Sequence, residues 1–164
     1  MIFVLGNETM IGGKSNLKPP TLGLAWFILC LSFAVNILDE LLHDFLGSYN
    51  PTVLTLYGHF SWFPRIDLTL GKWLVIVLGA DVVLLLMTPC AFRRAGFMRP
   101  LAYGFATLMF LKGLGTILIS ALGQTVGSVR FTGGAPGVYS SPLLMVASLY
   151  LLLCLRSSKR LGSP

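Results

Sequence analysis

Four apolar runs dominate this chain and limit what it can fold into. The first three, at about 21–42, 73–92 and 101–122, reach the roughly 20 residues that a helix needs to cross a hydrocarbon core of about 30 Å. The fourth, at about 140–155, is shorter. Only 11% of the residues are charged, against roughly 25% in soluble domains. We therefore predict an all-α integral membrane protein, an antiparallel four-helix transmembrane bundle.

The positions of the basic residues predict how this bundle is oriented. One side of the membrane would carry eight Lys and Arg residues and the other side three. The eight are Lys14, Lys18, Arg93, Arg94, Arg99, Arg156, Lys159 and Arg160, and the three are Arg65, Lys72 and Arg130. Because cytoplasmic loops carry such an excess, both termini are expected in the cytoplasm, with the protein in a bacterial-type inner membrane.

We expect a single domain. Its parts are a cytoplasmic arm (1–20), the four-span bundle (21–156) and a basic cytoplasmic tail (157–164). The outer loop at 45–71 is rich in aromatic residues, which predicts a short interfacial helix near 51–57. The second outer loop, at 123–139, contains many glycines and is expected to form an irregular flap over the outer mouth of the bundle.

Small residues line one face of the third span. They are Ala102, Ala106, Gly113, Thr116 and Ser120. Such a stripe lets a neighbouring helix approach closely. We expect it to pack against the second or first span, although a contact between two copies of the chain would use the same chemistry.

Two ionisable residues lie at membrane depth. Counted at about 1.5 Å per residue from the outer ends of their spans, Asp81 is about 12 Å deep and Lys112 about 15 Å deep. A lone charge at mid-span costs about 2.5–3.5 kcal/mol. Attraction between unit charges about 4 Å apart contributes roughly 4 kcal/mol at an effective dielectric constant near 20. We therefore predict that Asp81 and Lys112 face each other, as a structural pair or as part of a proton or substrate site.

A second polar concentration lies at the outer end of the first span. On a helix, Asn36, Glu40 and His43 fall on one face with Asp39 beside them. Glu40 and His43 have the E-x-x-H spacing of di-iron bundles, but those sites need a second such pair, which this sequence lacks. Together with His59 and Asp39 they are the candidate ligands of a single divalent ion. The alternative is a helix end whose carboxylates are simply hydrated.

A third interpretation places these groups in one cleft that opens outward. Asn36 and Glu40 would line it, Asp81 and Lys112 would form its floor, and an arginine would lie at its rim. Such a cleft suits acid–base chemistry or binding of a lipid or quinone-like molecule. The candidate catalytic residues are Glu40, His43, Asp81 and Lys112, and the candidate ligand-binding residues are Asn36, Asp39, Trp62, Arg65 and Arg130.

The sequence leaves three function classes open. It contains no phosphate-binding loop, no G-x-S-x-G and no H-E-x-x-H, so none of these enzyme signatures is present. It also has no basic stripe interleaved with aromatic residues, so we expect no nucleic-acid partner. The absence of a complete catalytic signature favours a non-catalytic subunit or helper of a membrane assembly, in contact with lipids and with other membrane chains or copies of itself. The alternatives are a small enzyme acting on a lipid or quinone-like substrate and a proton-linked carrier that works as a homo-oligomer.

Overall fold

The structure is a computed structural model that describes residues 22–60, 62–64, 66–125, 130 and 134–160, the last three by their backbone alone. Its helices are α1 (Leu22–Leu42), α2 (Phe45–His59), α3 (Leu70–Leu86), α4 (Thr88–Phe92), α5 (Met98–Leu122) and α6 (Ser141–Arg160). No strand occurs among these residues, which confirms the predicted all-α fold.

Three helical stretches are long and apolar enough to cross a membrane, namely Leu22–Leu42, Leu70–Phe92 and Met98–Leu122. They agree with the first three predicted spans to within a few residues. A shorter apolar stretch, Ser141–Ser157, lies in α6. The prediction of a membrane protein is therefore confirmed at the level of three membrane-length helices.

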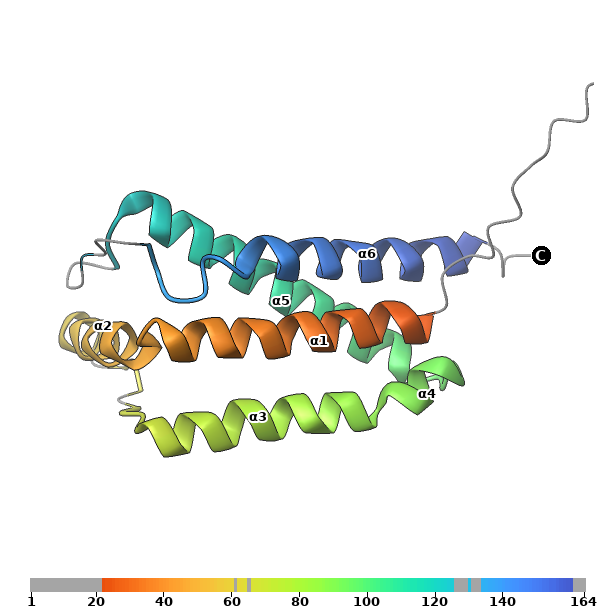
Figure 1. Ribbon diagram of the computed structural model, residues 1–164, viewed down its shortest axis with the longest axis horizontal. Helices are drawn as coiled ribbons and strands as arrows, with labels where there is room; N and C mark the ends of the chain where they lie inside the picture. The colour runs from red at the N-terminus through yellow and green to blue at the C-terminus, as the bar shows by residue number, and fades with distance from the viewer. Residues whose placement is uncertain (1–21, 61, 65, 126–129, 131–133, 161–164) are drawn as a thin grey trace, which may run out of the picture.

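Helix α1 lies at the centre of the molecule (Figure 1). It packs against α6 on one side and against α3 and α4 on the other. Helix α5 crosses α1 obliquely and packs mainly against α6, whereas α3 packs chiefly against α1 and α4 (Figure 1). Helix α2 and the segment that leads into α6 lie at one end of the molecule, and α4 lies at the other.

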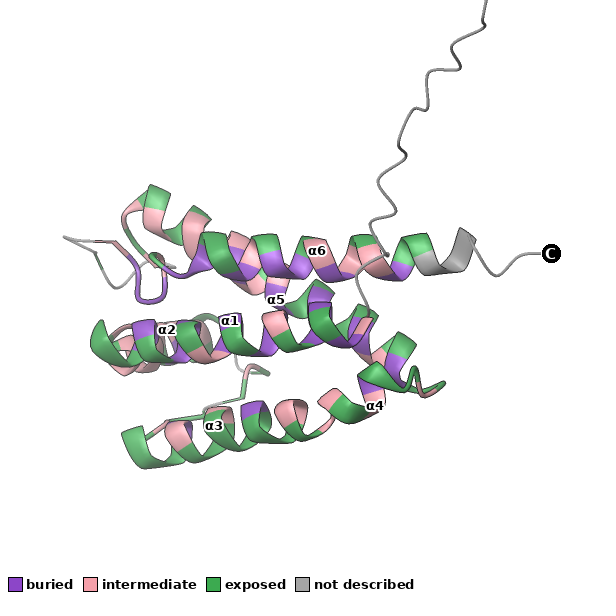
Figure 2. Cartoon of the chain, turned by 45° about the vertical axis from the view of Figure 1, so that its right-hand side comes forward, coloured by how far each residue is buried: buried purple, intermediate pink, exposed green. Residues whose placement is uncertain are grey.

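The hydrophobic core lies between α1, α5 and α6. Trp26, Leu29 and Leu151 are fully buried there. The Phe105 ring of α5 lies 5.3 Å from the Trp26 ring, between ring centroids. Of an apolar segment of 18 residues in each stretch, 61% is buried in α1 but only 11% in Leu70–Phe92. Figure 2 shows the same contrast between the two helices. Helix α1 is therefore enclosed by protein while α3 is peripheral.

The second predicted span is not one continuous helix. Helix α3 ends at Leu86, and α4 begins after Met87. Pro89 explains the break, because proline has no N–H to donate to the preceding turn and its ring clashes with that turn. Near the break, Trp26 Nε1 donates a hydrogen bond of 3.0 Å to the Leu84 carbonyl, which ties α3 to α1.

Helix α2 is longer than the predicted 51–57, since it spans 15 residues. The Asp44 side chain accepts a hydrogen bond from Gly47 N at its start, an N-cap that favours helix formation. The Asn50 side chain then holds the next connection, because it both donates to the Leu68 carbonyl at 3.0 Å and accepts from Leu68 N at 3.1 Å.

The stripe of small residues on α5 forms a packing seam, but its neighbour differs from the prediction. A Cβ atom on Gly113 would lie 2.8 Å from Met145 Cγ and 3.2 Å from the Ser141 carbonyl oxygen, both in α6. The seam therefore brings α5 close to α6 rather than to the second or first span.

Candidate functional site

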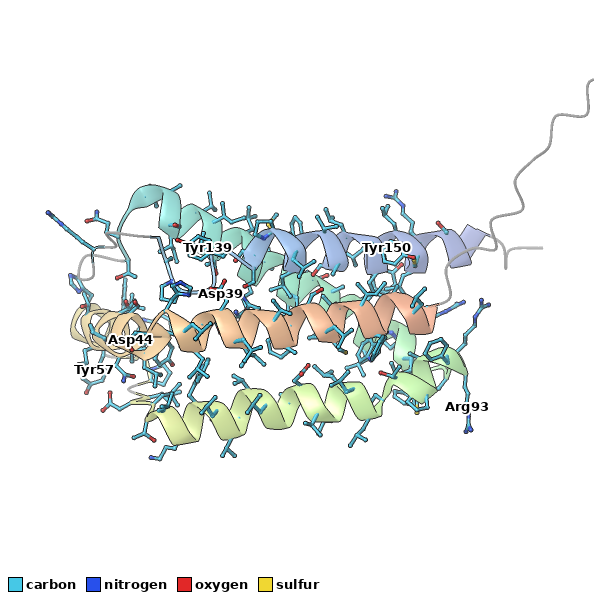
Figure 3. All side chains as sticks on the ribbon, viewed as in Figure 1. Asp39, Asp44, Tyr57, Arg93, Tyr139 and Tyr150 are labelled. Atoms are coloured by element: carbon cyan, nitrogen blue, oxygen red, sulfur yellow. The ribbon has the colours of Figure 1, made fainter. Side chains whose placement is uncertain are left out.

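A cluster of polar side chains joins α1, α5 and the start of α6 at the end of the molecule where α2 lies. We call Asn36, Asp39, Glu40, Lys112 and Ser140 the polar cluster. Asn36 is fully buried, and Asp39, Glu40 and Ser140 are at most 8% exposed. Figure 3 shows Asp39 in the space between α1 and the chain that enters α6. The cluster lies where helices of distant sequence meet, so it can fix their relative positions.

The positive charge of Lys112 is paired with polar groups of α1. Its Nζ atom donates to Glu40 Oε1 at 2.5 Å and also to Asn36 Oδ1. The Lys112 side chain is 29% exposed and Glu40 is 5% exposed by the same measure. Because the ammonium has both an ionic partner and a neutral acceptor, much of the cost of removing it from water is offset.

The other carboxylate of the cluster is held by hydrogen bonds to Ser140. Asp39 Oδ2 accepts from both the backbone N and the hydroxyl of Ser140, each at 2.8 Å. Asn36 Nδ2 donates to the same hydroxyl at 2.8 Å. On the solvent-exposed edge of the cluster, His43 Nδ1 lies 2.8 Å from Asp39 Oδ1, and its ring lies 5.1 Å from the ring of Tyr139.

The glycine-rich segment before α6 closes over this cluster. Gly137 has a φ of +83°, and a Cβ atom there would lie 3.0 Å from Glu40 Cγ and 3.1 Å from Asn36 Nδ2. Only glycine suits both the left-handed backbone and this close approach. The Gly137 carbonyl accepts hydrogen bonds from the hydroxyl of Ser141 at 2.7 Å and from Asn36 Nδ2 at 3.4 Å.

A cavity of about 260 Å³ lies beside the polar cluster. Glu40 forms part of its wall, together with Thr116 and Ile119 of α5. Thr52 and Leu56 of α2 and the aromatic ring of Phe63 also line it, so the wall combines one carboxylate, several hydroxyls and apolar groups. The cavity thus borders the only ion pair between α1 and α5 that we find among the described residues.

The predicted pairing of Asp81 with Lys112 is wrong. Lys112 is paired with Glu40, while Asp81 is buried on α3 and its Oδ1 atom has no hydrogen-bond partner among the described residues. Helix α1 lies between α3 and the α5–α6 pair (Figure 1). The prediction rested on the similar depths of Asp81 and Lys112 along their own helices. Helix α1 lies between α3 and α5, and its Glu40 pairs with Lys112 instead.

The candidate metal ligands are not brought together. Glu40 turns to Lys112, and His43 turns to Asp39. His59 is exposed at the end of α2, where its Nδ1 atom lies 2.9 Å from the Thr55 carbonyl oxygen. Within the described residues, no three His, Cys, Asp or Glu side chains are grouped so that they could hold a metal ion.

Two of the remaining candidate ligand residues, Trp62 and Arg130, are exposed, and the third lies outside the described residues. Trp62 is 78% exposed and contacts the rings of Phe60 and Phe63. Arg130 is exposed and its backbone forms an isolated bridge with Gln124. Arg65 lies outside the described residues. An arginine at the rim of the cleft, Arg65 or Arg130, stays a prediction.

Sequence reasoning missed two members of this site, Gly137 and Ser140. Gly137 contributes its backbone carbonyl, and Ser140 contributes its backbone N–H and its hydroxyl. Neither residue type is conspicuous in a glycine-rich loop. The usable signal was the position of the loop directly before an apolar helix, where unpaired N–H groups attract a carboxylate.

Comparison with protein families, curated proteins and solved structures finds no match for this chain. The site is therefore interpreted from its own chemistry.

Proposed function

We propose that the protein is a non-catalytic subunit or helper of a larger membrane assembly. The observation that carries this proposal is the mutual pairing within the polar cluster. Lys112 binds Glu40 and Asn36, and Asp39 binds Ser140 and His43. An acid–base residue must exchange protons with a substrate, whereas these groups serve one another and hold three segments of the chain together.

The exposed apolar surface of α3 agrees with a role inside a membrane assembly. Val75 is 75% exposed and Leu86 is 72% exposed, and α3 packs chiefly on α1 and α4 within the chain. Lipid tails and apolar side chains of other membrane proteins can both cover such a face.

We extend the proposal to the topology, with α6 as the fourth span, alternating helix directions and both termini in the cytoplasm. Helix α6 has 20 residues, about 30 Å at a rise of roughly 1.5 Å per residue. Arg93 lies at the opposite end of the molecule from Asp44 and Tyr57 (Figure 3). Basic residues at one end and the polar cluster at the other support this orientation.

The subunit role is tested by measuring the native mass of the tagged chain, extracted from its own membrane in mild detergent. We expect one or more unlike chains to co-purify in a fixed ratio and to remain bound through size-exclusion chromatography. A particle that contains this chain alone, in every detergent that preserves its helicity, would contradict the proposal.

The topology is tested by labelling introduced cysteines with a membrane-impermeant maleimide, in a variant whose three native cysteines are replaced by serine or alanine. Tyr57→Cys, which is exposed on α2, is expected to react in intact cells. Ser157→Cys, exposed near the end of α6, is expected to react only after permeabilisation. The reverse pattern would invert the proposed orientation, and reaction of both in intact cells would remove one span.

A further inference from the structure

We propose that the cavity beside Glu40 binds one neutral amphiphile, with a hydroxyl head that donates to Glu40 and an alkyl body that packs against α2 and α5. The inference concerns a ligand of this chain itself and does not depend on its being a subunit of an assembly. It rests on three features of the cavity, which are its hydrogen-bonding capacity, its charge and the division of its wall into polar and apolar parts.

Three polar side chains of the wall, those of Glu40, Thr116 and Thr52, can accept hydrogen bonds from a ligand. Glu40 Oε1 accepts from Lys112, but no described residue donates to Glu40 Oε2. The hydroxyl hydrogen of Thr116 is used on the Lys112 carbonyl at 3.0 Å. That of Thr52 is used on the Ser48 carbonyl at 2.7 Å or on the Thr125 hydroxyl at 3.0 Å. A hydroxyl has one donor hydrogen, so these two threonines can act only as acceptors, while the hydroxyls of Ser48 and Tyr49, which also line the cavity, can donate or accept. A ligand hydroxyl can therefore donate to the free oxygen of Glu40 and accept from the wall.

The charge of the site favours a neutral head. The carboxylate of Glu40 is already balanced by the ammonium of Lys112. A ligand anion would lie against a carboxylate oxygen, and a ligand cation would compete with Lys112 for the same carboxylate. A neutral hydroxyl satisfies the free oxygen without adding a charge that the surroundings would have to compensate.

The rest of the wall suits an apolar chain. Leu56 and Phe63 lie on the α2 side, and Ile119 lies on α5. Ile119 is 38% exposed, so the wall on this side continues onto the outer surface of α5. A cavity of about 260 Å³ holds a head group and the first part of a chain, and the remainder can extend along that surface. Burial of the first methylene groups would contribute about 0.8 kcal/mol each.

The test uses a photoactivatable medium-chain fatty alcohol as the probe, with the intact chain in mild detergent and with labelled peptides mapped by mass spectrometry. We expect labelling of the α2 and α5 peptides that line the cavity. Unlabelled alcohol should compete, while its methyl ether, which cannot donate, should compete about tenfold less well because a hydrogen bond to a charged group is lost. Equal competition by the ether, or stronger competition by the fatty acid or the alkylammonium, would overturn the assignment of a neutral donor head.

Matched variants locate the site. Thr116→Phe fills the cavity without removing a member of the polar cluster, and Leu118→Phe makes a similar change at a residue of α5 that is 54% exposed and does not line the cavity. We expect T116F to lose most of the labelling and L118F to retain it. Equal labelling of the two variants would overturn the site.

A second pair of variants keeps the test decisive if T116F does not fold. Leu56→Ala removes part of the apolar wall on α2, and Leu54→Ala makes the same change at a residue of α2 that is 45% exposed. Of the two residues, Leu56 lines the cavity and Leu54 does not. Competition by the unlabelled alcohol should weaken in L56A and not in L54A, and identical curves would contradict the proposed packing of the alkyl body against α2.

Discussion

The two sides of α1 are held by different kinds of interaction. On the α5–α6 side, the polar cluster and the close approach at Gly113 join three segments. On the α3 side, Trp26 donates a hydrogen bond to the Leu84 carbonyl, and apolar side chains supply most of the other contacts among the described residues. Asp81 faces this second interface with an oxygen that has no partner among the described residues.

This difference shows what selects a helix partner in a bilayer. Lipid tails are as apolar as leucine, so apolar area alone gives little preference for one neighbour over another. Hydrogen bonds between helices and close packing of small residues do give such a preference. We therefore expect α1, α5 and α6 to form the stable part of the molecule and α3 to be the most weakly attached of the long helices.

The largest expected effect comes from breaking the ion pair. Lys112→Met leaves Glu40 and Asn36 without their donor, and loss of one partner of a buried pair costs about 3–5 kcal/mol. The free energy of unfolding is measured by denaturant titration in detergent micelles, with Leu111→Met as the control at an exposed neighbour. Partial recovery of stability in the double variant E40Q/K112M would attribute the loss to the unpaired carboxylate. Equal stability of K112M and L111M would contradict the view that the polar cluster is the main interaction between α1, α5 and α6.

A smaller loss is expected when the loop can no longer approach α1. Gly137→Ala and Gly123→Ala both place a side chain at positive φ, at +83° and +69°, which costs roughly 1–2 kcal/mol. Only the Cβ at residue 137 also meets Glu40 and Asn36, and overpacking of this kind costs about 1–3 kcal/mol more. The comparison of the two unfolding free energies checks this, and a G123A loss equal to that of G137A would indicate that the loop has room to move.

The α3 interface should respond in the opposite direction. Asp81→Leu removes a buried oxygen that has no partner among the described residues, so we expect the free energy of unfolding to rise by about 1–3 kcal/mol. Asp39→Leu, which removes the acceptor of two Ser140 hydrogen bonds, should instead lower it. A clear loss of stability in D81L would show that Asp81 has a polar partner in the folded protein. The α1–α3 interface would then resemble the α1–α5–α6 interface in being held by polar contacts.

The smallest effect contrasts two helical glycines. Apart from the backbone of its own helix, no atom of the described residues lies within 4 Å of a Cβ built on Gly79 in α3, so Gly79→Ala should stabilise by about 0.5–1 kcal/mol. In α5, Gly113→Ala meets Met145 and the Ser141 carbonyl oxygen and should destabilise by about 1 kcal/mol or more. Thermal unfolding in detergent distinguishes the two signs. A destabilised G79A would reveal a close neighbour on α3, such as a second chain.

Several elements could be predicted from residues alone because they depend on local order. Apolar length predicted three membrane-length helices, and turn-forming residues separated them in the right places. The aromatic connection predicted a helix, although its N-cap at Asp44 and its full extent were missed. Pro89 lies inside the second run, yet the break that it causes was not anticipated. The four-span topology and the cytoplasmic termini remain predictions.

Four residues of the polar cluster were named from the sequence, but the contacts between them were not. Asn36, Asp39, Glu40 and Lys112 were all singled out, and all belong to the polar cluster. Their pairing was wrong because the order of helices around α1 is a long-range property that depth along the sequence does not contain. Helix α5 also crosses α1 obliquely, so counting residues from its end misjudges which part of α1 it meets (Figure 1).

What the residues by themselves determined is that this chain carries membrane-length helices and a few polar groups that cannot remain alone in an apolar medium. Hydropathy and helix rise are local quantities, so these conclusions needed no knowledge of neighbours. What only the tertiary structure decided is which groups meet. The central position of α1 gives Lys112 a carboxylate on α1 and leaves Asp81 without a partner in the described chain, and the glycine at 137 lets a distant loop supply Ser140 to complete the cluster.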